Sequence, residues 1–256
     1  MNNTTTATNS PAKLQRHLAL WHIIIIGLAY IQPMTVFDTF GLVSEASHQH
    51  VPTSYIIALI AILLTSLSYG SMIRRYPSAG SAYTYAQKSI HPNVGFMVGW
   101  SSWLDYLLSP LVNIILAVIY LEALFPDVNN WIWVFILTGF MTWINVHGSK
   151  VVAYFNSWIV FIQLLIIGVF TWLVYSKLMA GTNADGTINA AAYQLWSLKP
   201  FWNDIANMTA LISGATILCF SFTGFDSLSS LAEETKDVQK TLPKAIFLTA
   251  LIAGIV

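Results

Sequence analysis

Seven long apolar runs restrict the folds that this sequence can adopt. A helix that crosses the hydrocarbon core of a bilayer needs about 20 predominantly apolar residues. Six complete runs approach or exceed that length, at residues 20–43, 52–73, 94–120, 131–147, 152–176 and 208–231. A seventh begins near Lys244, and the sequence ends within it at Val256. We therefore expect an all-α integral membrane protein with six complete transmembrane helices and the start of a seventh, as the N-terminal portion of a longer chain.

The composition supports a membrane location and excludes several other classes of protein. Hydrophobic residues make up 56% of the chain and charged residues 9%, whereas an ordinary soluble domain carries about 25% charged residues. That balance excludes a soluble enzyme, a disordered regulator and a secreted disulfide scaffold. The formal net charge is zero, so no basic surface indicates a nucleic-acid partner. The lipid bilayer is the partner that the composition predicts.

Basic residues are distributed unevenly between the two sides of the predicted helices. Nine lie in the N-terminal tail or in connections on the same side: Lys13, Arg16, Arg74, Arg75, Lys88, Lys150, Lys236, Lys240 and Lys244. The opposite connections hold Lys177 and Lys199. Short loops rich in Lys and Arg remain in the cytoplasm. We therefore expect a multi-pass protein of the cell membrane with a cytoplasmic N-terminus.

Two polar interruptions divide the first and the sixth apolar runs. In the first run, Pro33 lacks an N–H group and clashes with the preceding turn, so it breaks or kinks the helix. In the sixth run, Gly224 is followed by Phe225 and Asp226, and an acid at mid-membrane depth is costly unless the backbone lines a cavity. Each interruption alone is compatible with an ordinary kink. Interrupted helices at positions one and six are, however, the pattern expected of an inverted repeat with its binding site near the midplane.

Five motifs in register along the chain resemble those of the amino acid–polyamine–organocation permeases. Within that superfamily the chain is most similar to bacterial putrescine importers. The motifs are Gly-Leu-Ala-Tyr at 27–30 with Pro-Met-Thr-Val-Phe-Asp-Thr-Phe-Gly at 33–41, Pro-Ser-Ala-Gly-Ser-Ala-Tyr-Thr-Tyr at 77–85, Gly-Phe-Met-Val-Gly-Trp-Ser-Ser-Trp-Leu-Asp-Tyr at 95–106, Phe-Ser-Phe-Thr-Gly-Phe-Asp at 220–226, and Glu-Glu-Thr at 233–235 with Pro-Lys-Ala at 243–245. The resemblance extends from about residue 14 to the end of the sequence.

This resemblance implies a leucine-transporter-like inverted-repeat fold, in which two five-helix repeats surround the substrate. It divides the chain into a cytoplasmic tail (1–17), the first five-helix repeat (18–178), an external loop (179–207) and the start of the second repeat (208–256), which holds helix six and part of helix seven. Permeases of this type work by alternating access. In that cycle the bundle containing helices one, two and six rocks against helix three and its neighbours.

The residues at the first interruption favour a substrate that has amines and no carboxylate. Amino acid permeases of the superfamily typically have a glycine-rich stretch there, whose free N–H groups bind the substrate carboxylate. In this chain the stretch is Ala-Tyr-Ile-Gln-Pro at 29–33, which is bulky and lacks one donor at the proline. We expect secondary active import of a small organic amine, such as putrescine or a related polyamine. An amino acid permease or exchanger of the same superfamily and a permease-like membrane sensor are the alternatives.

An ammonium group in a low-dielectric site needs carboxylates, carbonyl groups or aromatic faces around it. Asp226 is the preferred carboxylate because it directly follows the second interruption. On a continuous α-helix, Asp226 and Glu233 would share one face about 10 Å apart, which suits an extended four-carbon diamine. Glu233 is equally compatible with a solvated helix end paired with Lys236. Asp105 is compatible with a structural acid bonded to a neighbouring helix.

Aromatic side chains near the two interruptions complete the candidate site. Tyr30 and Tyr106 offer ring faces and hydroxyl groups to a cation, although tyrosines of membrane helices often pack at the interface. By resemblance to the family, Tyr106 lies at the site and Phe225 acts as a gate over the ligand. The predicted substrate-binding residues are Ala29, Tyr30, Thr35, Tyr106, Phe222, Phe225, Asp226 and Glu233, and the predicted gating or coupling residues are Asp38, Asp105 and Glu234.

The energy source for transport is predicted to be an ion gradient or exchange. The sequence has no phosphate-binding loop of the Gly-x-x-x-x-Gly-Lys-Ser/Thr type, which nucleotide hydrolysis by that route requires. A proton is the favoured coupling ion, because Asp226 or Glu233 in a partly dry cavity would hold a proton more readily than in water. Sodium is the alternative. We expect no enzymatic activity, no cofactor and no metal, since His48 and His50 lack further ligands at zinc-site spacing.

Overall fold

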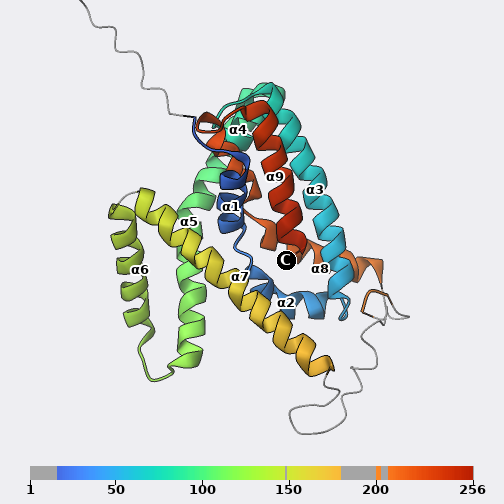
Figure 1. Cartoon of the computed structure of the whole chain (residues 1–256), viewed down its shortest axis with the longest axis vertical. Helices are drawn as coiled ribbons and strands as arrows, with labels where there is room; N and C mark the ends of the chain where they lie inside the picture. The colour runs from blue at the N-terminus through green and yellow to red at the C-terminus, as the bar shows by residue number, and fades with distance from the viewer. Residues whose placement is uncertain (1–15, 148, 180–199, 203–206, 256) are drawn as a thin grey trace, which may run out of the picture.

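The structure is a computed structural model that describes residues 16–147, 149–179, 200–202 and 207–255. Within these residues the regular structure is helical, apart from one isolated bridge between Leu18 and Thr235 (Figure 1). The predicted tail at 1–17 and the predicted external loop at 179–207 fall mostly outside the described residues. The elements in chain order are α1 (Leu20–Ile31), α2 (Thr35–Ala46), α3 (Val51–Arg75), α4 (Ser81–Ser89), α5 (Pro92–Leu124), α6 (Asn130–Val146), α7 (Ser149–Met179), α8 (Met208–Leu218), the 3-10 helices η2 (Cys219–Phe222) and η3 (Phe225–Glu233), and α9 (Val238–Ile255).

The helices coincide with the predicted apolar runs. Five helical segments of the described residues are long and apolar enough to cross a membrane, and the bent pair α1–α2 makes a sixth. α6 is apolar and has 17 residues, which is the lower end of the range for a spanning helix. The expectation of an all-α integral membrane fold is therefore confirmed. The short helix α4 lies between two of these spans and packs against α5.

The start of α9 differs from the prediction. α9 begins at Val238 rather than near Lys244. The carbonyl group of Asp237 accepts hydrogen bonds from the backbone N–H groups of Lys240 and Thr241, both at 2.9 Å, and so forms the first turn. The prediction was wrong because it placed the start of the helix after Pro243. A proline in a helix interior removes one hydrogen bond. Pro243 is nevertheless a buried residue within α9, and the helix continues past it.

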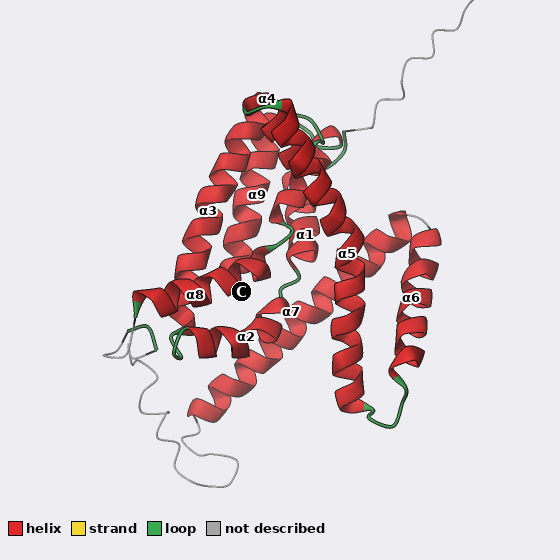
Figure 2. Cartoon of the chain, turned by 180° about the vertical axis from the view of Figure 1, so that it is seen from behind, coloured by secondary structure: helices red, strands yellow, loops and turns green. Residues whose placement is uncertain are grey.

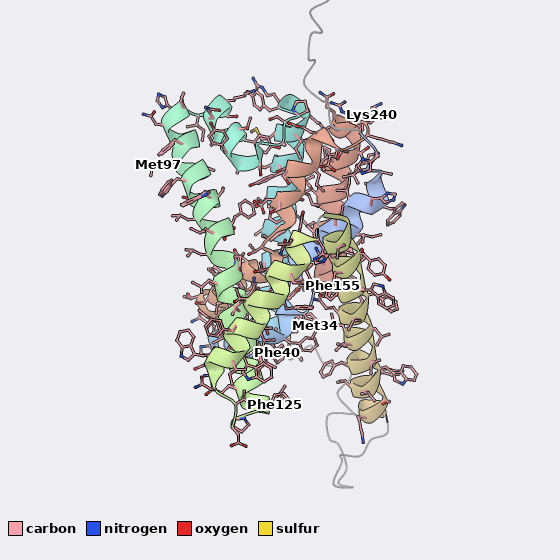
Figure 3. All side chains as sticks on the ribbon, turned by 90° about the vertical axis from the view of Figure 1, so that its left-hand side faces the viewer. Met34, Phe40, Met97, Phe125, Phe155 and Lys240 are labelled. Atoms are coloured by element: carbon pink, nitrogen blue, oxygen red, sulfur yellow. The ribbon has the colours of Figure 1, made fainter. Side chains whose placement is uncertain are left out.

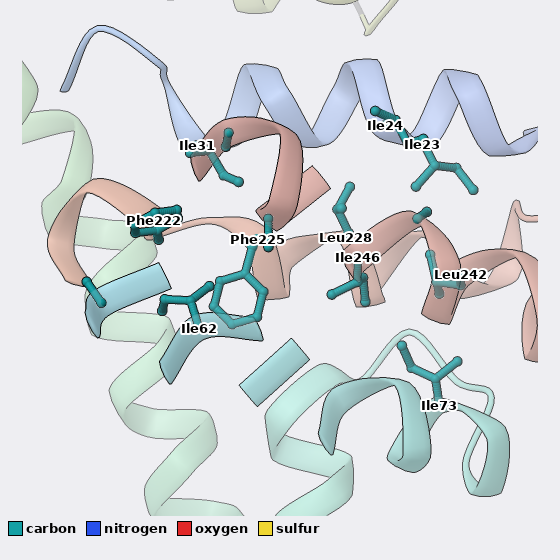
Figure 4. Packing of buried hydrophobic residues seen from close by; sticks show 14 of the residues in the cluster. Ile23, Ile24, Ile31, Ile62, Ile73, Phe222, Phe225, Leu228, Leu242 and Ile246 are labelled. Carbon is teal, nitrogen blue, oxygen red and sulfur yellow. The ribbon is translucent and has the colours of Figure 1, made fainter. Parts of the chain in front are cut away.

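A compact inner bundle consists of α1, α2, α3, α8, η3 and α9. α3 lies along α9 and α8, while α1 packs against α9 and η3. Figure 4 shows side chains from these elements meeting in one apolar interior. Ile23 of α1, Leu228 of η3, and Leu242 and Ile246 of α9 are fully buried there. Lipid is as apolar as these side chains, so the inner bundle is held by close van der Waals packing of this shared core and not by transfer out of water.

Gly27 permits the close approach of α1 to the rest of the inner bundle. A Cβ atom added at Gly27 would lie 2.6 Å from Cγ2 of Thr249 and 2.7 Å from Cδ1 of Leu228. We expect Gly27→Ala to lower the free energy of unfolding by about 1–3 kcal/mol, because overpacking a filled core is destabilising. Thermal unfolding in detergent measures the effect. Gly168→Ala is the control, since no atom of the described residues lies within 4 Å of a Cβ added there. A midpoint for Gly27→Ala at or above that of the control would contradict this account.

α5, α6 and α7 form an outer layer beside the inner bundle. α5 and α6 are joined as an antiparallel hairpin, and α7 runs diagonally from α6 past α1 (Figure 1, and from behind in Figure 2). Their apolar side chains project outward along most of their length, as Met97 and Phe125 do in Figure 3. Exposed apolar surface of this extent marks an interface with lipid or with further protein.

At one end of the molecule, the beginning of the described chain contacts the segment that follows η3. The N–H groups of His17 and Leu18 both donate to the carbonyl group of Glu234 at 3.0 Å. The N–H group of Lys236 donates in return to the carbonyl group of Leu18 at 3.1 Å. Arg16 lines a pocket together with the first residues of α9. The basic residues on both sides of this contact therefore share one end of the bundle.

Candidate substrate-binding site

The first break separates α1 from α2. Gln32 adopts a left-handed conformation with φ of 53°, and the two helices are bent by 51° (Figure 2). The backbone N–H and the hydroxyl group of Thr35 both donate to the carbonyl group of Gln32, at 2.9 and 2.8 Å. Pro33 has no N–H group to donate to the carbonyl group of Ala29. The C-terminal end of α1 carries partial negative charge, and the helix dipole there favours a cation.

The second break lies around Gly224, between η2 and η3. Gly224 has a φ of 104°, a conformation that favours glycine because it has no Cβ atom. A Cβ atom added there would lie 2.7 Å from the carbonyl oxygen of Tyr30. Nearby, the hydroxyl oxygens of Thr39 and Ser221 are 3.1 Å apart and buried. The two breaks therefore touch each other, with Gly224 placed directly against the end of α1.

α5 supplies the third wall of the site. The hydroxyl oxygens of Tyr106 and Ser227 are 3.2 Å apart, which links α5 to η3. The hydroxyl group of Ser109 donates to the carbonyl oxygen of Asp105 at 2.7 Å and lies 3.4 Å from its carboxylate Oδ1. The side-chain amide of Asn113 donates to the carbonyl group of Ser109 at 3.0 Å. Polar side chains thus follow one face of a helix that is otherwise apolar.

A cavity of about 810 Å³ lies between the two breaks and α5. No Lys, Arg or His side chain of the described residues lines it, whereas two carboxylates do. Among the described residues no group of three or more His, Cys, Asp or Glu side chains is placed to hold a metal ion. The polar lining includes Tyr30, Gln32, Thr35, Asp38, Ser101, Asp105, Tyr106, Ser109, Asn113, Thr223, Ser227 and Ser230.

The two carboxylates of the cavity lie far from each other. The hydroxyl group of Tyr120 donates to Oδ1 of Asp38 at 2.5 Å. Tyr120 follows Asp105 on α5 by 15 residues, which corresponds to about 22 Å along a helix. The two carboxylates are therefore reached from different levels of α5. Asp105 lies at the level of the breaks, and Asp38 lies toward the opposite end of α5.

Phe222 and Phe225 point away from the cavity. Phe222 is 1% exposed and its ring centroid lies 5.7 Å from that of Tyr55. Phe225 is 8% exposed and its ring centroid lies 5.7 Å from that of Tyr69. Both rings belong to the core of the inner bundle (Figure 4). The structure therefore places the predicted substrate-binding phenylalanines behind the second break, in packing contacts with α3.

The expectation that Asp226 and Glu233 share one face assumed a continuous α-helix, and the structure does not have one there. They lie on the 3-10 helix η3, in which seven residues span about 14 Å and end a third of a turn out of register. The hydroxyl group of Ser229 donates to the carbonyl group of Asp226 at 2.6 Å within this tight winding. Asp226 is half-buried, and neither it nor the exposed Glu233 lines the cavity. The carbonyl group of Glu234 is bonded to the N-terminal segment instead.

Ala29 lines a second cavity that adjoins the first. This cavity has a volume of about 1010 Å³ and lies between α1, α5, α6 and α7. Gln32, Tyr106, Ser109 and Asn113 line both cavities. Of the predicted residues, the structure brings Tyr30, Thr35, Asp38, Asp105 and Tyr106 together around the main cavity, with Ala29 at its border.

Residue-by-residue reasoning missed a polar stripe on α5. Ser101, Asp105, Ser109 and Asn113 recur at intervals of four, and all four line the cavity. Residues four apart lie on the same face of an α-helix, so this spacing was a signal available in the sequence. Asp105 alone gave no hint of the hydroxyl and amide groups that accompany it.

Broken helices that meet at a polar cavity define a membrane permease, and residues 22–256 match the amino acid permease family. The chain therefore belongs to this family. It is 54% identical over 256 residues to the low-affinity putrescine importer PlaP of Escherichia coli K12, covering all of this chain and 55% of PlaP. It is 27% identical over 239 residues to the amino-acid permease RocE of Bacillus subtilis, covering 91% of this chain and 50% of RocE. It is 26% identical over 247 residues to the lysine-specific permease LysP of E. coli, covering 94% of this chain and 49% of LysP.

The chain spans about half the length of the curated relatives it matches. No solved structure matches it. In this chain the walls of the cavity are the two broken helices and α5.

Proposed function

We propose that the full-length permease imports a small organic amine, putrescine or a related polyamine, through the cavity between the two breaks. The observation that carries this proposal is the lining of that cavity, which combines carboxylates, hydroxyl groups and a tyrosine with no basic side chain among the described residues. Such a lining attracts cations and offers no basic partner to a substrate carboxylate. The similarity to PlaP, named as a putrescine importer, supports the same substrate class.

Asp105 is the proposed partner of one ammonium group of the substrate. The ring face of Tyr106 lies next to it on α5 and stabilises a cation by its quadrupole. The carbonyl end of α1 completes a cation site that needs no second carboxylate nearby. This assignment moves the principal substrate acid from Asp226, which the sequence favoured, to Asp105, which lines the cavity.

Asp38 and Asp226 have other proposed roles. Asp38 is bonded to Tyr120 across the space between α2 and α5, so it is suited to a gate that opens when this hydrogen bond breaks. Asp226 is half-buried beside the second break. It is the acid proposed to take up a coupling proton, because its protonation would change the charge at the break itself.

The proposed transport cycle is alternating access without covalent chemistry. The inner bundle moves against α5, α6 and α7, which pack less extensively against it. In this scheme residues 18–178 form the first repeat and residues 208–256 begin the second. Arg74, Arg75, Lys88 and Lys240 lie toward the end of the bundle where the described chain begins, which supports a cytoplasmic N-terminus by the distribution of positive charge.

Uptake of radiolabelled putrescine into proteoliposomes that contain the full-length permease tests this function. We expect uptake driven by an inward proton gradient, inhibition by excess spermidine and no inhibition by neutral amino acids. Dissipating the proton gradient should stop accumulation and leave exchange. Uptake of lysine or of a neutral amino acid without uptake of putrescine would instead establish an amino acid permease and overturn the amine assignment.

A further inference from the structure

A small pocket lies between α3 and α9 at the end of the bundle where α3 finishes and α9 begins. Its volume is about 230 Å³, and Arg74, Lys244, Ser71, Leu67 and Phe247 are among its lining residues. Gly70 allows the two helices to meet at its floor, because a Cβ atom added there would lie 3.1 Å from Cβ of Pro243. The pocket is separate from the substrate cavity, with which it shares no lining residue.

The two cations of the pocket are exposed, and no carboxylate of the described residues lines it or pairs with them. The neighbouring cations are engaged elsewhere. The guanidinium group of Arg75 lies 5.7 Å from the ring centroid of Tyr76, and the ammonium group of Lys88 lies 5.5 Å from it. Arg74 and Lys244 therefore present two positive charges to one pocket, with the hydroxyl group of Ser71 beside them.

The ends of two helices lie near the pocket. The side-chain amide of Gln239 donates to the carbonyl group of Arg74 at 3.2 Å, which occupies one free carbonyl group at the end of α3. The first turn of α9 lies at the same end, and the N-terminus of a helix carries partial positive charge. The C-terminal end of α3 carries partial negative charge, so the positive field in the pocket comes from the side chains of Arg74 and Lys244.

An apolar strip extends from the pocket along α3. Leu67, Leu64 and Ile60 are each more than half exposed, and their spacing of three and four residues places them on one face of the helix. Both α3 and α9 are long and apolar enough to cross a membrane. The strip therefore runs from the two cations toward the centre of the bilayer, which is the course of an acyl chain attached to a headgroup.

We propose that this pocket binds the phosphate group of an anionic phospholipid, with one acyl chain along the strip on α3. Arg74 and Lys244 contact the phosphate oxygens from two different helices, so the bound lipid links the end of α3 to the start of α9. Basic pockets between transmembrane helices are established sites for anionic lipid headgroups. The apolar strip distinguishes a lipid from a free phosphate ion, which needs no such surface.

Native mass spectrometry of the full-length permease in detergent, titrated with phosphatidylglycerol or phosphatidylcholine, tests this proposal. Each cation near a membrane surface contributes enough to change lipid affinity about fivefold. We expect Arg74→Gln and Lys244→Gln each to weaken phosphatidylglycerol binding by about that factor, and the double variant by more. Arg75→Gln and Lys88→Gln remove the same charge from cations that face Tyr76, and they should leave binding unchanged.

Two results would overturn the proposal. An equal loss of phosphatidylglycerol binding in Arg75→Gln and Lys88→Gln would mean that lipid responds to overall surface charge and not to this pocket. Displacement of phosphatidylglycerol by millimolar inorganic phosphate, with no preference for lipid, would identify an anion site without an acyl-chain contact. Arg74→Lys keeps the charge and is expected to retain most of the binding that Arg74→Gln loses.

Discussion

Asp105→Asn is expected to reduce putrescine uptake by the full-length permease roughly 30-fold or more. The substitution keeps the shape of the side chain and a hydrogen-bonding group for Ser109, but it removes the charge that faces an ammonium group. Asp105 is exposed in the structure; where the bound substrate desolvates the pair, loss of one partner typically weakens binding by at least this factor. The substrate concentration at half-maximal uptake should rise, since the missing charge acts on substrate binding. Initial rates of radiolabelled uptake over a range of putrescine concentrations measure the effect.

Glu122→Gln is the matched control for Asp105→Asn. Glu122 is the other acid of α5, and its carboxylate accepts a hydrogen bond from the side-chain amide of Asn130 at 2.9 Å, outside the cavity. We expect nearly normal uptake in this variant. Normal uptake in Asp105→Asn would show that the wall assigned here is not the binding wall, whatever the effect of Asp226→Asn, because Asp226 is also the acid proposed to take up the coupling proton.

The breaks were predictable from the sequence because their causes are local. Pro33 lacks an N–H group whatever surrounds it, and Gly224 is one of the few residues that tolerate a φ of 104°. Apolar run length likewise depends on the thickness of the bilayer and not on packing. These features fixed the order of the spanning helices and the positions of both interruptions before any contact between helices was known.

The orientation of side chains around the second break was not predictable, because it depends on how tightly the backbone winds. An α-helix turns 100° per residue and a 3-10 helix turns 120°, so a few residues suffice to move a side chain to another face. That difference places Phe222 and Phe225 in the core and separates Asp226 from Glu233. The serines of η3, such as Ser229, bond to carbonyl groups three residues earlier, a local preference that the sequence shows only in outline.

The candidate site was partly predictable for a different reason. Tyr30, Thr35 and Tyr106 were identified from their motifs, and they line the cavity. The choice among the acids depended on which of them faces that space, and this is a property of tertiary packing. Asp105 stands on a stripe of polar residues on α5 that lines the cavity, whereas Asp226 follows the break and does not line it. Proximity to a break in the sequence is therefore a weaker indicator that an acid lines the cavity than its position on a polar helix face.

Gly224→Ala is expected to reduce uptake by roughly ten- to a hundredfold, even though the change adds one methyl group. The new Cβ atom would lie 2.7 Å from the carbonyl oxygen of Tyr30, a backbone atom that cannot rotate away. The φ of 104° is in addition unfavourable for alanine, and backbone strain of this kind costs about 1–3 kcal/mol. The two broken helices must therefore separate, which displaces the carbonyl end of α1 from the substrate.

Gly41→Ala separates this effect from a general loss of glycine flexibility. Gly41 lies on α2, just beyond the first break, and nothing in the described residues lies within 4 Å of a Cβ added there. Uptake by Gly41→Ala should equal that of the unmodified permease at the same amount of protein in the membrane. If Gly224→Ala also retained full uptake, contact between the two breaks would not be needed for transport. The site would then depend on α5 and on side chains alone, since the carbonyl groups of α1 would no longer be held against the cavity.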